Sequence, residues 1–231
     1  MEFEGRRVVV TGGTGALGTA LVTALVEAGA LCHVPYIHAS ELERFPLKDD
    51  KRVRLVAATD LAEEASVQRA FAGAEDLWAS IHLAGGFAMR PLAETGRTEL
   101  MAMIDQNLAS CYLCCRAAVR AMAERGGRIV NVAARPALEP RTGAGMTAYT
   151  VAKAGVAALT EALAEEVAAK GILVNAVAPS IMDTPANRKA MPKANHDAWP
   201  KVEEVARTIQ FLASPANRVT RGAIVTVYGR S

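Results

Sequence analysis

A tyrosine and a lysine stand four positions apart at Tyr149 and Lys153, in a segment whose hydrophobic pattern predicts a helix. Residues at this spacing lie on one face of a helix, so we expect the phenol and the ammonium side by side. A neighbouring cation favours the ionised phenol and lowers its pKa from about 10. Such a pair could move a proton near neutral pH, although in isolation it is more often an ordinary aromatic–cation contact.

A glycine-rich turn near the N-terminus has a valine-rich strand candidate before it and a helical pattern after it. Gly13, Gly15 and Gly18 match the spacing G-x-G-x-x-G, in which a tight turn, an approaching pyrophosphate and a close helix–strand contact each require a missing Cβ. The N-terminus of the next helix offers unpaired N–H groups to an anion. With this context the turn predicts a dinucleotide site rather than a turn without a ligand. The turn residues expected to bind are Gly12, Gly13, Thr14, Gly15, Ala16, Leu17 and Gly18.

The end of the second strand candidate has no acidic residue. In NAD-binding chains a carboxylate near this point holds the ribose hydroxyls, whereas here Tyr36 is followed by Ile37 and His38. No arginine or lysine replaces it, so the sequence favours neither NAD nor NADP. We expect discrimination below about a hundredfold, or roughly 2.7 kcal/mol. His38 could contact a ribose or a phosphate, but a loop histidine is more often solvated.

Short apolar runs alternate with longer amphipathic stretches along the whole chain. Their continuous hydrophobicity is typical of strands covered on both faces. The strand candidates are residues 6–11, 30–36, 52–57, 77–83, 127–133, 172–177 and 223–227, and the helix candidates are residues 16–28, 63–71, 97–124, 146–170 and 202–213. This alternation predicts an α/β fold, a single doubly wound Rossmann-type domain over residues 1–231 with a seven-stranded parallel sheet. Residues 179–200 lack periodicity and are interpreted as a substrate lid.

Composition limits the partners and the location. The formal net charge of the 231 residues is +2, which gives no reason to expect nucleic acid or an anionic membrane as a partner. No apolar run has the length of a membrane span, and the first residues do not form a signal peptide, so a cytoplasmic location is expected. The four cysteines have no second Cys-x-x-Cys pair or nearby histidines, so we expect packed, reduced thiols and no metal site.

Taken together, these landmarks resemble the short-chain dehydrogenase/reductase family across essentially the whole length. The resemblance is carried by the turn at residues 11–18, the Asp60-Leu61 pair, Ala84-Gly85, Asn107, the Tyr149/Lys153 spacing, residues 174–179 and Thr184. It implies that Tyr149 donates the proton and that Lys153 and Asn107 sustain a proton relay. It also implies a homodimer or homotetramer through the two long helices. The further residues that it assigns to the NAD or NADP site are Tyr36, Asp60, Leu61, Ala84, Gly85, Gly86, Tyr149, Lys153, Pro179, Ser180 and Thr184.

One departure from the family bears on the substrate. By alignment, Ala134 stands where the family has a substrate-orienting serine, and an alanine cannot donate a hydrogen bond. Losing such a donor commonly costs on the order of a hundredfold in rate. The same loss, the Gly-Ala-Leu-Gly turn and the segment at residues 183–192 resemble dihydropteridine reductase-like members of the family.

Three functions therefore stay open for this sequence. The first is an NAD(P)H-dependent reductase of a small electrophile, such as a quinonoid dihydropterin-like heterocycle. The second is a carbonyl or 3-oxoacyl reductase in which Arg135, Thr142 or Thr147 replaces the missing donor. The third is a weakly catalytic dinucleotide-binding or sensor protein, although such a protein would not need the Tyr149, Lys153 and Asn107 set.

Overall fold

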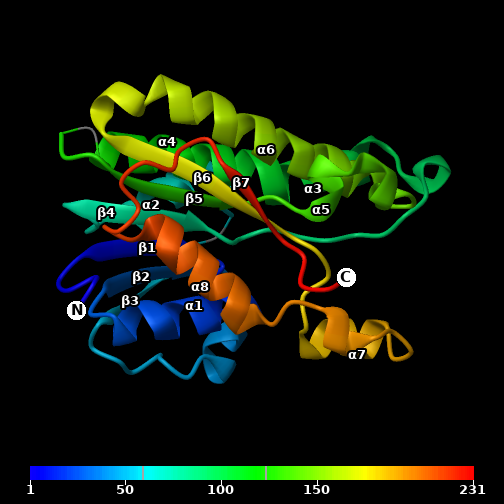
Figure 1. Cartoon of the computed structure of the whole chain (residues 1–231), viewed down its shortest axis with the longest axis horizontal. Coiled ribbons are helices and arrows are strands. Elements are labelled where there is room, and N and C mark those ends of the chain that lie inside the picture. Colours follow the sequence, from blue (N-terminus) through cyan, green and yellow to red (C-terminus); the bar gives the residue numbers. More distant parts are fainter. Residues whose placement is uncertain (59, 123) are drawn as a thin grey trace.

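A computed structural model of the chain describes residues 1–58, 60–122 and 124–231. It contains one sheet of seven parallel strands, as predicted, and their order is β3-β2-β1-β4-β5-β6-β7 (Figure 1). The strands are β1 (Arg7–Thr11), β2 (Leu31–Tyr36), β3 (Val53–Ala57), β4 (Leu77–His82), β5 (Gly127–Val132), β6 (Ile172–Pro179) and β7 (Ile224–Val227). Because the strands are parallel, their carboxyl ends share one edge of the sheet, where the glycine turn and Ala134 are found.

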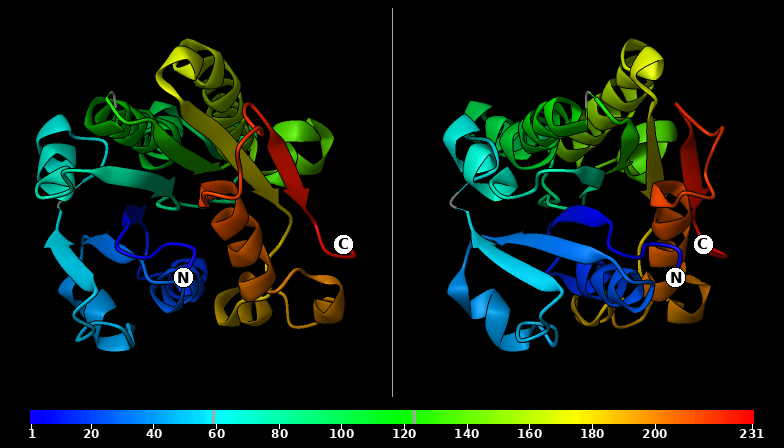
Figure 2. Two further views of the ribbon diagram at one scale, coloured as in Figure 1. Left: turned by 60° about the vertical axis from the view of Figure 1, so that its left-hand side comes forward. Right: turned by 90° about the vertical axis from the view of Figure 1, so that its left-hand side faces the viewer.

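Helices cover both faces of the sheet (Figures 1 and 2). On one face α1 (Ala16–Glu27) packs against α8 (Val202–Ala213). On the other face α4 (Ser110–Met122) contacts β4 and β5, and α6 (Thr147–Glu166) contacts β6. Val8, Val9 and Val10 of β1 are fully buried between the two layers, which explains why the strand shows no polar alternation.

The remaining helices are short or lie at the sheet edges. α2 (Glu64–Phe71) packs on α4, α3 (Arg97–Ile104) packs on α6, α5 (Arg135–Leu138) follows β5, and α7 (Pro185–Ala190) follows β6. A 3-10 helix (Ala39–Arg44) follows β2 directly. No helix in the described part of the chain is long and apolar enough to cross a membrane.

Most predicted boundaries agree with the structure to within two residues. The helix predicted at residues 97–124 is instead interrupted by a π-helical turn (Asp105–Ala109) between α3 and α4. Residue 123, which the predicted helix included, lies outside the described residues. The expected featureless lid at residues 179–200 contains α7, a helix that proline at its first position makes favourable. Gly29 and Gly171 follow helices with φ of +95° and +70°, the left-handed conformation in which glycine commonly ends a helix.

Candidate active site

Helix α6 places Tyr149 and Lys153 at the carboxyl edge of the sheet. The Lys153 Nζ donates a 2.8 Å hydrogen bond to the carbonyl of Val132 at the end of β5, and its side chain is buried. The Nζ lies 5.9 Å from the centre of the Tyr149 ring. The exposed Phe87 meets that ring edge to face, with centroids 5.1 Å apart and an angle of 82°. The sequence spacing therefore brings the pair together, with the ammonium anchored to β5.

Burial moves both pKa values against the charged forms. It raises the pKa of Tyr149 to about 12 and lowers the pKa of Lys153 to about 8. The expectation that the ammonium lowers the phenol's pKa is therefore wrong for the chain by itself, because desolvation acts more strongly on the phenol than the nearby cation does. At neutral pH the phenol is protonated and can donate its proton.

The π-helical turn (Asp105–Ala109) directs the Asn107 side chain toward Lys153. Its Nδ2 donates to the carbonyls of Gly86 and Met103, each at 3.0 Å, and its Oδ1 is buried with no hydrogen-bond partner among the described residues. A Cβ added at Gly85 would lie 2.7 Å from this oxygen and 3.5 Å from the Lys153 Nζ. The glycine thus keeps open a small space that holds an acceptor and a donor, and a hydroxyl or a water would satisfy the buried oxygen.

The glycine turn fits a bound pyrophosphate. Gly12 has a φ of +67°, and a Cβ there would lie 2.7 Å from the backbone nitrogen of Ala84. Gly13 is packed as closely, since its Cβ would lie 2.7 Å from Val34 Cγ1. Helix α1 begins after Gly15 with no side-chain cap and no acidic residue in its first turn, so no carboxylate of the helix itself neutralises its positive end. These features provide the cradle that an anionic dinucleotide requires.

Two cavities meet at this turn. The first, which we call the tyrosine cavity, has a volume of about 320 Å³. It brings together most of the residues predicted for the site: Gly12, Gly15, Ala16, Leu17, Gly18, Gly85, Gly86, Asn107, Tyr149, Lys153, Pro179, Ser180 and Thr184. Ala134 and the apolar Phe87 and Met182 complete the wall.

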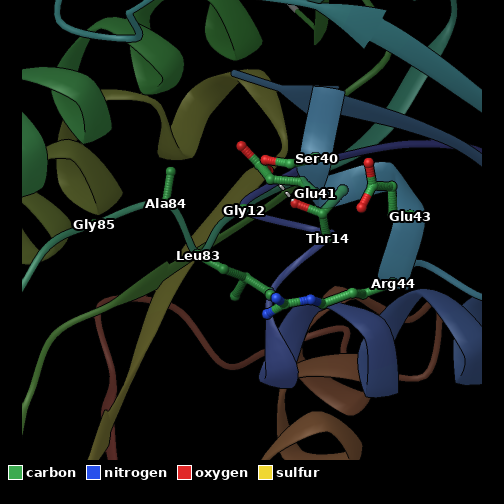
Figure 3. Close-up of a pocket in the computed structure, with 10 residues that line it drawn as sticks. Gly12, Thr14, Ser40, Glu41, Glu43, Arg44, Leu83, Ala84 and Gly85 are labelled. Carbon is green, nitrogen blue, oxygen red and sulfur yellow. Dashed lines mark hydrogen bonds between the residues drawn. The ribbon is translucent and has the colours of Figure 1, made fainter. Parts of the chain in front are cut away.

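The second, which we call the glutamate cavity, has a volume of about 490 Å³. Figure 3 shows its lining. Thr14 and Ala84 were predicted for the site, whereas the residues contributed by the 3-10 helix were not. Those additional residues are Ser40, Glu41, Glu43 and Arg44.

Glu41 reaches back over the end of β2. Its Oε2 accepts a 2.5 Å hydrogen bond from Thr14 Oγ1, and its Oε1 accepts from the backbone N–H groups of Ile37 and His38 at 3.3 and 2.8 Å. Burial acts to raise the pKa of Glu41, but the hydrogen bonds from Thr14, His38 and Ile37 outweigh it and lower that pKa. The acid that the sequence lacks at the strand end is thus supplied from Glu41, at the third position of a short helix that begins just after it.

Four predicted cofactor residues, Gly13, Tyr36, Asp60 and Leu61, line neither cavity. Tyr36 pairs with Ala57 at the ends of β2 and β3. The Asp60 Oδ1 accepts from the backbone N–H of Ala62 at 2.8 Å, and Leu61 is buried in a small apolar cluster. Neither cavity has them in its lining, so their assignment to the cofactor stays a prediction.

The structure places Ala134 at the site but not its suggested replacements. Ala134 is buried and immediately precedes α5. The Arg135 guanidinium pairs with Glu139 at 2.8 Å, and the Thr142 hydroxyl donates to the Glu139 carbonyl. Arg135, Thr142 and Thr147 are not among the residues that line the tyrosine cavity. None of these three residues is therefore placed to replace the missing serine hydroxyl.

The expected lid contributes one wall. Thr184 caps α7 by accepting from the Asn187 N–H at 3.2 Å, and both Thr184 and Met182 line the tyrosine cavity. The Arg188 guanidinium forms two hydrogen bonds to the Asp183 carboxylate, at 2.5 and 2.9 Å. Arg188 is therefore occupied by an ion pair on the outer side of the lid.

Behind the site, two of the cysteines approach a histidine that is distant in sequence. Cys111, Cys115 and His82 are buried, with their potential ligand atoms within 4.8 Å of one another. The His82 ring bonds to Asn131 and Ser80, each at 2.8 Å. Because these bonds already use both ring nitrogens, the cluster is a hydrogen-bonded support between α4, β4 and β5. The sequence did not reveal this contact, because His82 lies 29 positions before Cys111 and comes close to it only when α4 packs against β4.

Known proteins resemble this chain over its full length. A family model described as short chain dehydrogenase matches residues 6–195. A galactitol 2-dehydrogenase from Rhizobium johnstonii is 35% identical over 98% of this chain and 95% of its own. A 3-oxoacyl-(acyl-carrier-protein) reductase from Pseudomonas aeruginosa is 30% identical over 99% and 98%. The solved structure of a blue fluorescent protein from a metagenomic library, in complex with NADPH, is 27% identical, covers 99% of this chain and 98% of that one, and superposes with a TM-score of 0.87.

Proposed function

The chain belongs to the short-chain dehydrogenase family and is an NAD(P)-dependent oxidoreductase, and we propose that it reduces a carbonyl group of a small molecule with Tyr149 as the proton donor. The observation that carries the proposal is that the partly buried Tyr149 phenol shares one cavity with Lys153 and Asn107. Relatives named for polyol oxidation and for 3-oxoacyl reduction support this class of reaction. They give no support to a dihydropterin as the substrate.

The chain's own residues account for binding and for the proton. The glycine turn and the N-terminus of α1 would hold the pyrophosphate, and a bound reduced nicotinamide supplies the hydride. The Tyr149 O–H donates its proton to the oxygen of the substrate, and the Lys153 ammonium stabilises the phenolate that remains. The buried Asn107 Oδ1 accepts a hydrogen bond from the hydroxyl or water that returns a proton toward Lys153.

A second substrate class is favoured by Ala134. Without a hydroxyl at this position the site polarises a carbonyl poorly, whereas a quinonoid heterocycle is electrophilic enough to need less polarisation. Phe87 and Met182 add apolar walls on which a flat ring could pack. A dihydropterin-like heterocycle is therefore the second candidate.

Steady-state oxidation of NADH and NADPH distinguishes the two classes. The substrates are a 3-oxoacyl thioester, a panel of simple ketones and keto-polyols, and quinonoid dihydropterin. Ala134→Ser adds one donor, so carbonyl reduction should rise by an amount that corresponds to roughly 2–4 kcal/mol of transition-state stabilisation, while heterocycle reduction changes little. If the protein reduces quinonoid dihydropterin but none of the carbonyl compounds, the proposal is overturned. If it binds the dinucleotide but reduces no substrate, a sensor is favoured.

Self-association through the long helices also stays a proposal. Tyr112 on α4 and Val151 on α6 are 55% and 51% exposed, so each helix presents a large apolar side chain to solvent. We expect a dimer or tetramer in sedimentation experiments, and Val151→Glu should shift it toward the monomer. A wild-type protein that sediments as a monomer at micromolar concentration would contradict this expectation.

A further inference from the structure

We propose that Glu41 makes this protein select NAD(H) over NADP(H), because its carboxylate occupies the groups that would otherwise bind a 2′-phosphate. The inference deepens the proposed function, on whose dinucleotide site it rests. It also replaces the expectation of weak discrimination, which was based on the absence of an acid at the end of β2.

The donors at this corner of the site are already used. The Thr14 hydroxyl, the Ile37 N–H and the His38 N–H all point to the Glu41 carboxylate, at 2.5, 3.3 and 2.8 Å. Figure 3 shows the carboxylate directed at Thr14, which belongs to the glycine turn. A hydroxyl from the turn and backbone N–H groups from the adjacent strand end form a small anion-binding arrangement. The chain fills that arrangement with its own anion.

The hydrogen-bonding capacity of the carboxylate then favours a ribose hydroxyl. An ionised carboxylate has about four acceptor sites and no donor, and three bonds already reach Glu41. The free capacity suits an O–H donor such as a ribose hydroxyl. A phosphate offers only acceptors when ionised, so it would meet the carboxylate with no shared hydrogen and with like charge.

The charge of the cavity lining points the same way. Glu41 and Glu43 contribute two negative charges and Arg44 one positive charge, a net charge of −1. In Figure 3 the Arg44 guanidinium does not point toward the Glu41 carboxylate. Arg44 thus leaves Glu41 unneutralised, and a 2′-phosphate could reach this cation only in the same cavity as both carboxylates.

Binding of the cofactors alone tests the inference without any substrate. Fluorescence titration of the wild-type protein should give an NADH affinity at least about tenfold above the NADPH affinity. Glu41→Gln keeps the side-chain length and an acceptor oxygen while it removes the charge. We expect this variant to shrink the NADH/NADPH affinity ratio at least about tenfold, mainly through tighter NADPH binding, with NADH affinity within about threefold of wild type.

Glu43→Gln is the matched control, since it removes the same charge from the same helix and the same cavity, whereas the three donors contact Glu41. Because Glu43 adds negative charge to the cavity but accepts none of these three hydrogen bonds, Glu43→Gln should shrink the affinity ratio by a clearly smaller factor than Glu41→Gln does. Titration with AMP and with adenosine 2′,5′-bisphosphate, a pair that differs by the 2′-phosphate, should reproduce the preference in the wild type and its loss in Glu41→Gln. This pair reports on the adenosine end even where the nicotinamide end is perturbed.

Two results would overturn the inference. A wild type that prefers NADPH would show that Arg44 governs the cavity. An unchanged ratio in Glu41→Gln, with both affinities retained or lowered in parallel, would show that Glu41 only caps its helix. Failure to bind either dinucleotide in the wild type would instead refute the dinucleotide site itself, so the two failures are distinguishable.

Discussion

The two cavities that meet at the glycine turn treat charge in opposite ways. In the tyrosine cavity burial disfavours both charged forms, raising the pKa of Tyr149 to about 12 and lowering that of Lys153 to about 8. In the glutamate cavity three hydrogen bonds outweigh burial and hold the pKa of Glu41 below its ordinary value. The difference lies in the hydrogen-bond donors. Three donors contact the Glu41 carboxylate, whereas desolvation is the main influence on the pKa of the Tyr149 phenol.

This contrast separates two tasks. A group that must give up and regain a proton is useful when its charged form is not strongly favoured, and desolvation provides that. A group that must discriminate between ligands by charge is useful when its charge is fixed. The catalytic chemistry and the choice of ligand can therefore be perturbed independently, and each experiment below tests that independence.

The largest effect is expected from Tyr149→Phe. Removing the phenolic hydroxyl eliminates the proton donor, and general acid catalysis is commonly worth about 10²–10⁴ in rate. We expect kcat to fall within that range while the NADH affinity from titration stays within about threefold. A comparable loss of affinity would show that the two cavities are not separable.

The next effect is a pH-dependent difference in stability between the wild type and Lys153→Met. The folded-state pKa of Lys153 is about 8, below the ordinary value of 10.5, so between these values the unfolded chain holds a proton that the folded chain has released. Stability of the wild type relative to the variant should therefore be lowest below pH 8 and rise toward pH 10.5, by about 2–3 kcal/mol in total.

Glu41→Gln should reveal a second pH-dependent difference in stability, in which the wild type again gains stability as pH rises, but in the acidic range below the ordinary Glu pKa of 4.5. Because the pKa of Glu41 is lowered on folding, its charge stabilises the folded chain above the pKa of the unfolded state, and that advantage is lost as pH falls through the folded-state pKa. Denaturant titrations at a series of pH values measure both profiles. A difference between the wild type and Glu41→Gln that stays flat across the acidic range would contradict the stabilised charge of Glu41.

A smaller effect separates charge from bulk in the glycine turn. A Cβ at Gly15 would have one near neighbour, the Gly12 carbonyl oxygen at 3.4 Å, which is an ordinary contact. Gly15→Ala should therefore change dinucleotide affinity only modestly, whereas Gly15→Asp places a negative charge beside the pyrophosphate site and should weaken binding at least about tenfold, or 1.4 kcal/mol. Equal losses in both variants would mean that bulk against the ligand, and not charge, sets the requirement for glycine.

The sequence predicts the sheet well because the strands are short, mainly apolar runs that need cover on both faces. It also predicts the Tyr149/Lys153 pair, whose spacing within one helix is local. Prediction from the sequence fails where the packing of distant segments determines the local structure. β6 continues to Pro179 although proline removes a ladder hydrogen bond, because its place next to β7 at the strand end does not require that N–H.

Two site properties could not be derived from residue order. The Tyr149 pKa depends on burial, which opposes the effect of the nearby lysine. The role of Glu41 depends on a 3-10 helix that returns the chain to the end of β2, so inspection of the strand end alone misses the acid. Capping-box spacing between position 38 and Glu41 was the available signal.

The π-helical turn at Asp105–Ala109 also fixes the length of the chain in this region. A π-turn holds one more residue than an α-turn, so it shifts the phase of the following helix by roughly one residue, or about 100°. Met103 before the turn and Cys111 after it are both buried, and they face the core only with this phase offset. Regular α-helical geometry over the same residues would rotate one of the two apolar faces toward solvent, whereas deleting one residue would remove the π-turn and leave both faces toward the core. Homologous chains should therefore either keep this residue count between Met103 and Cys111 together with the π-turn, or lack one residue and have a continuous α-helix there.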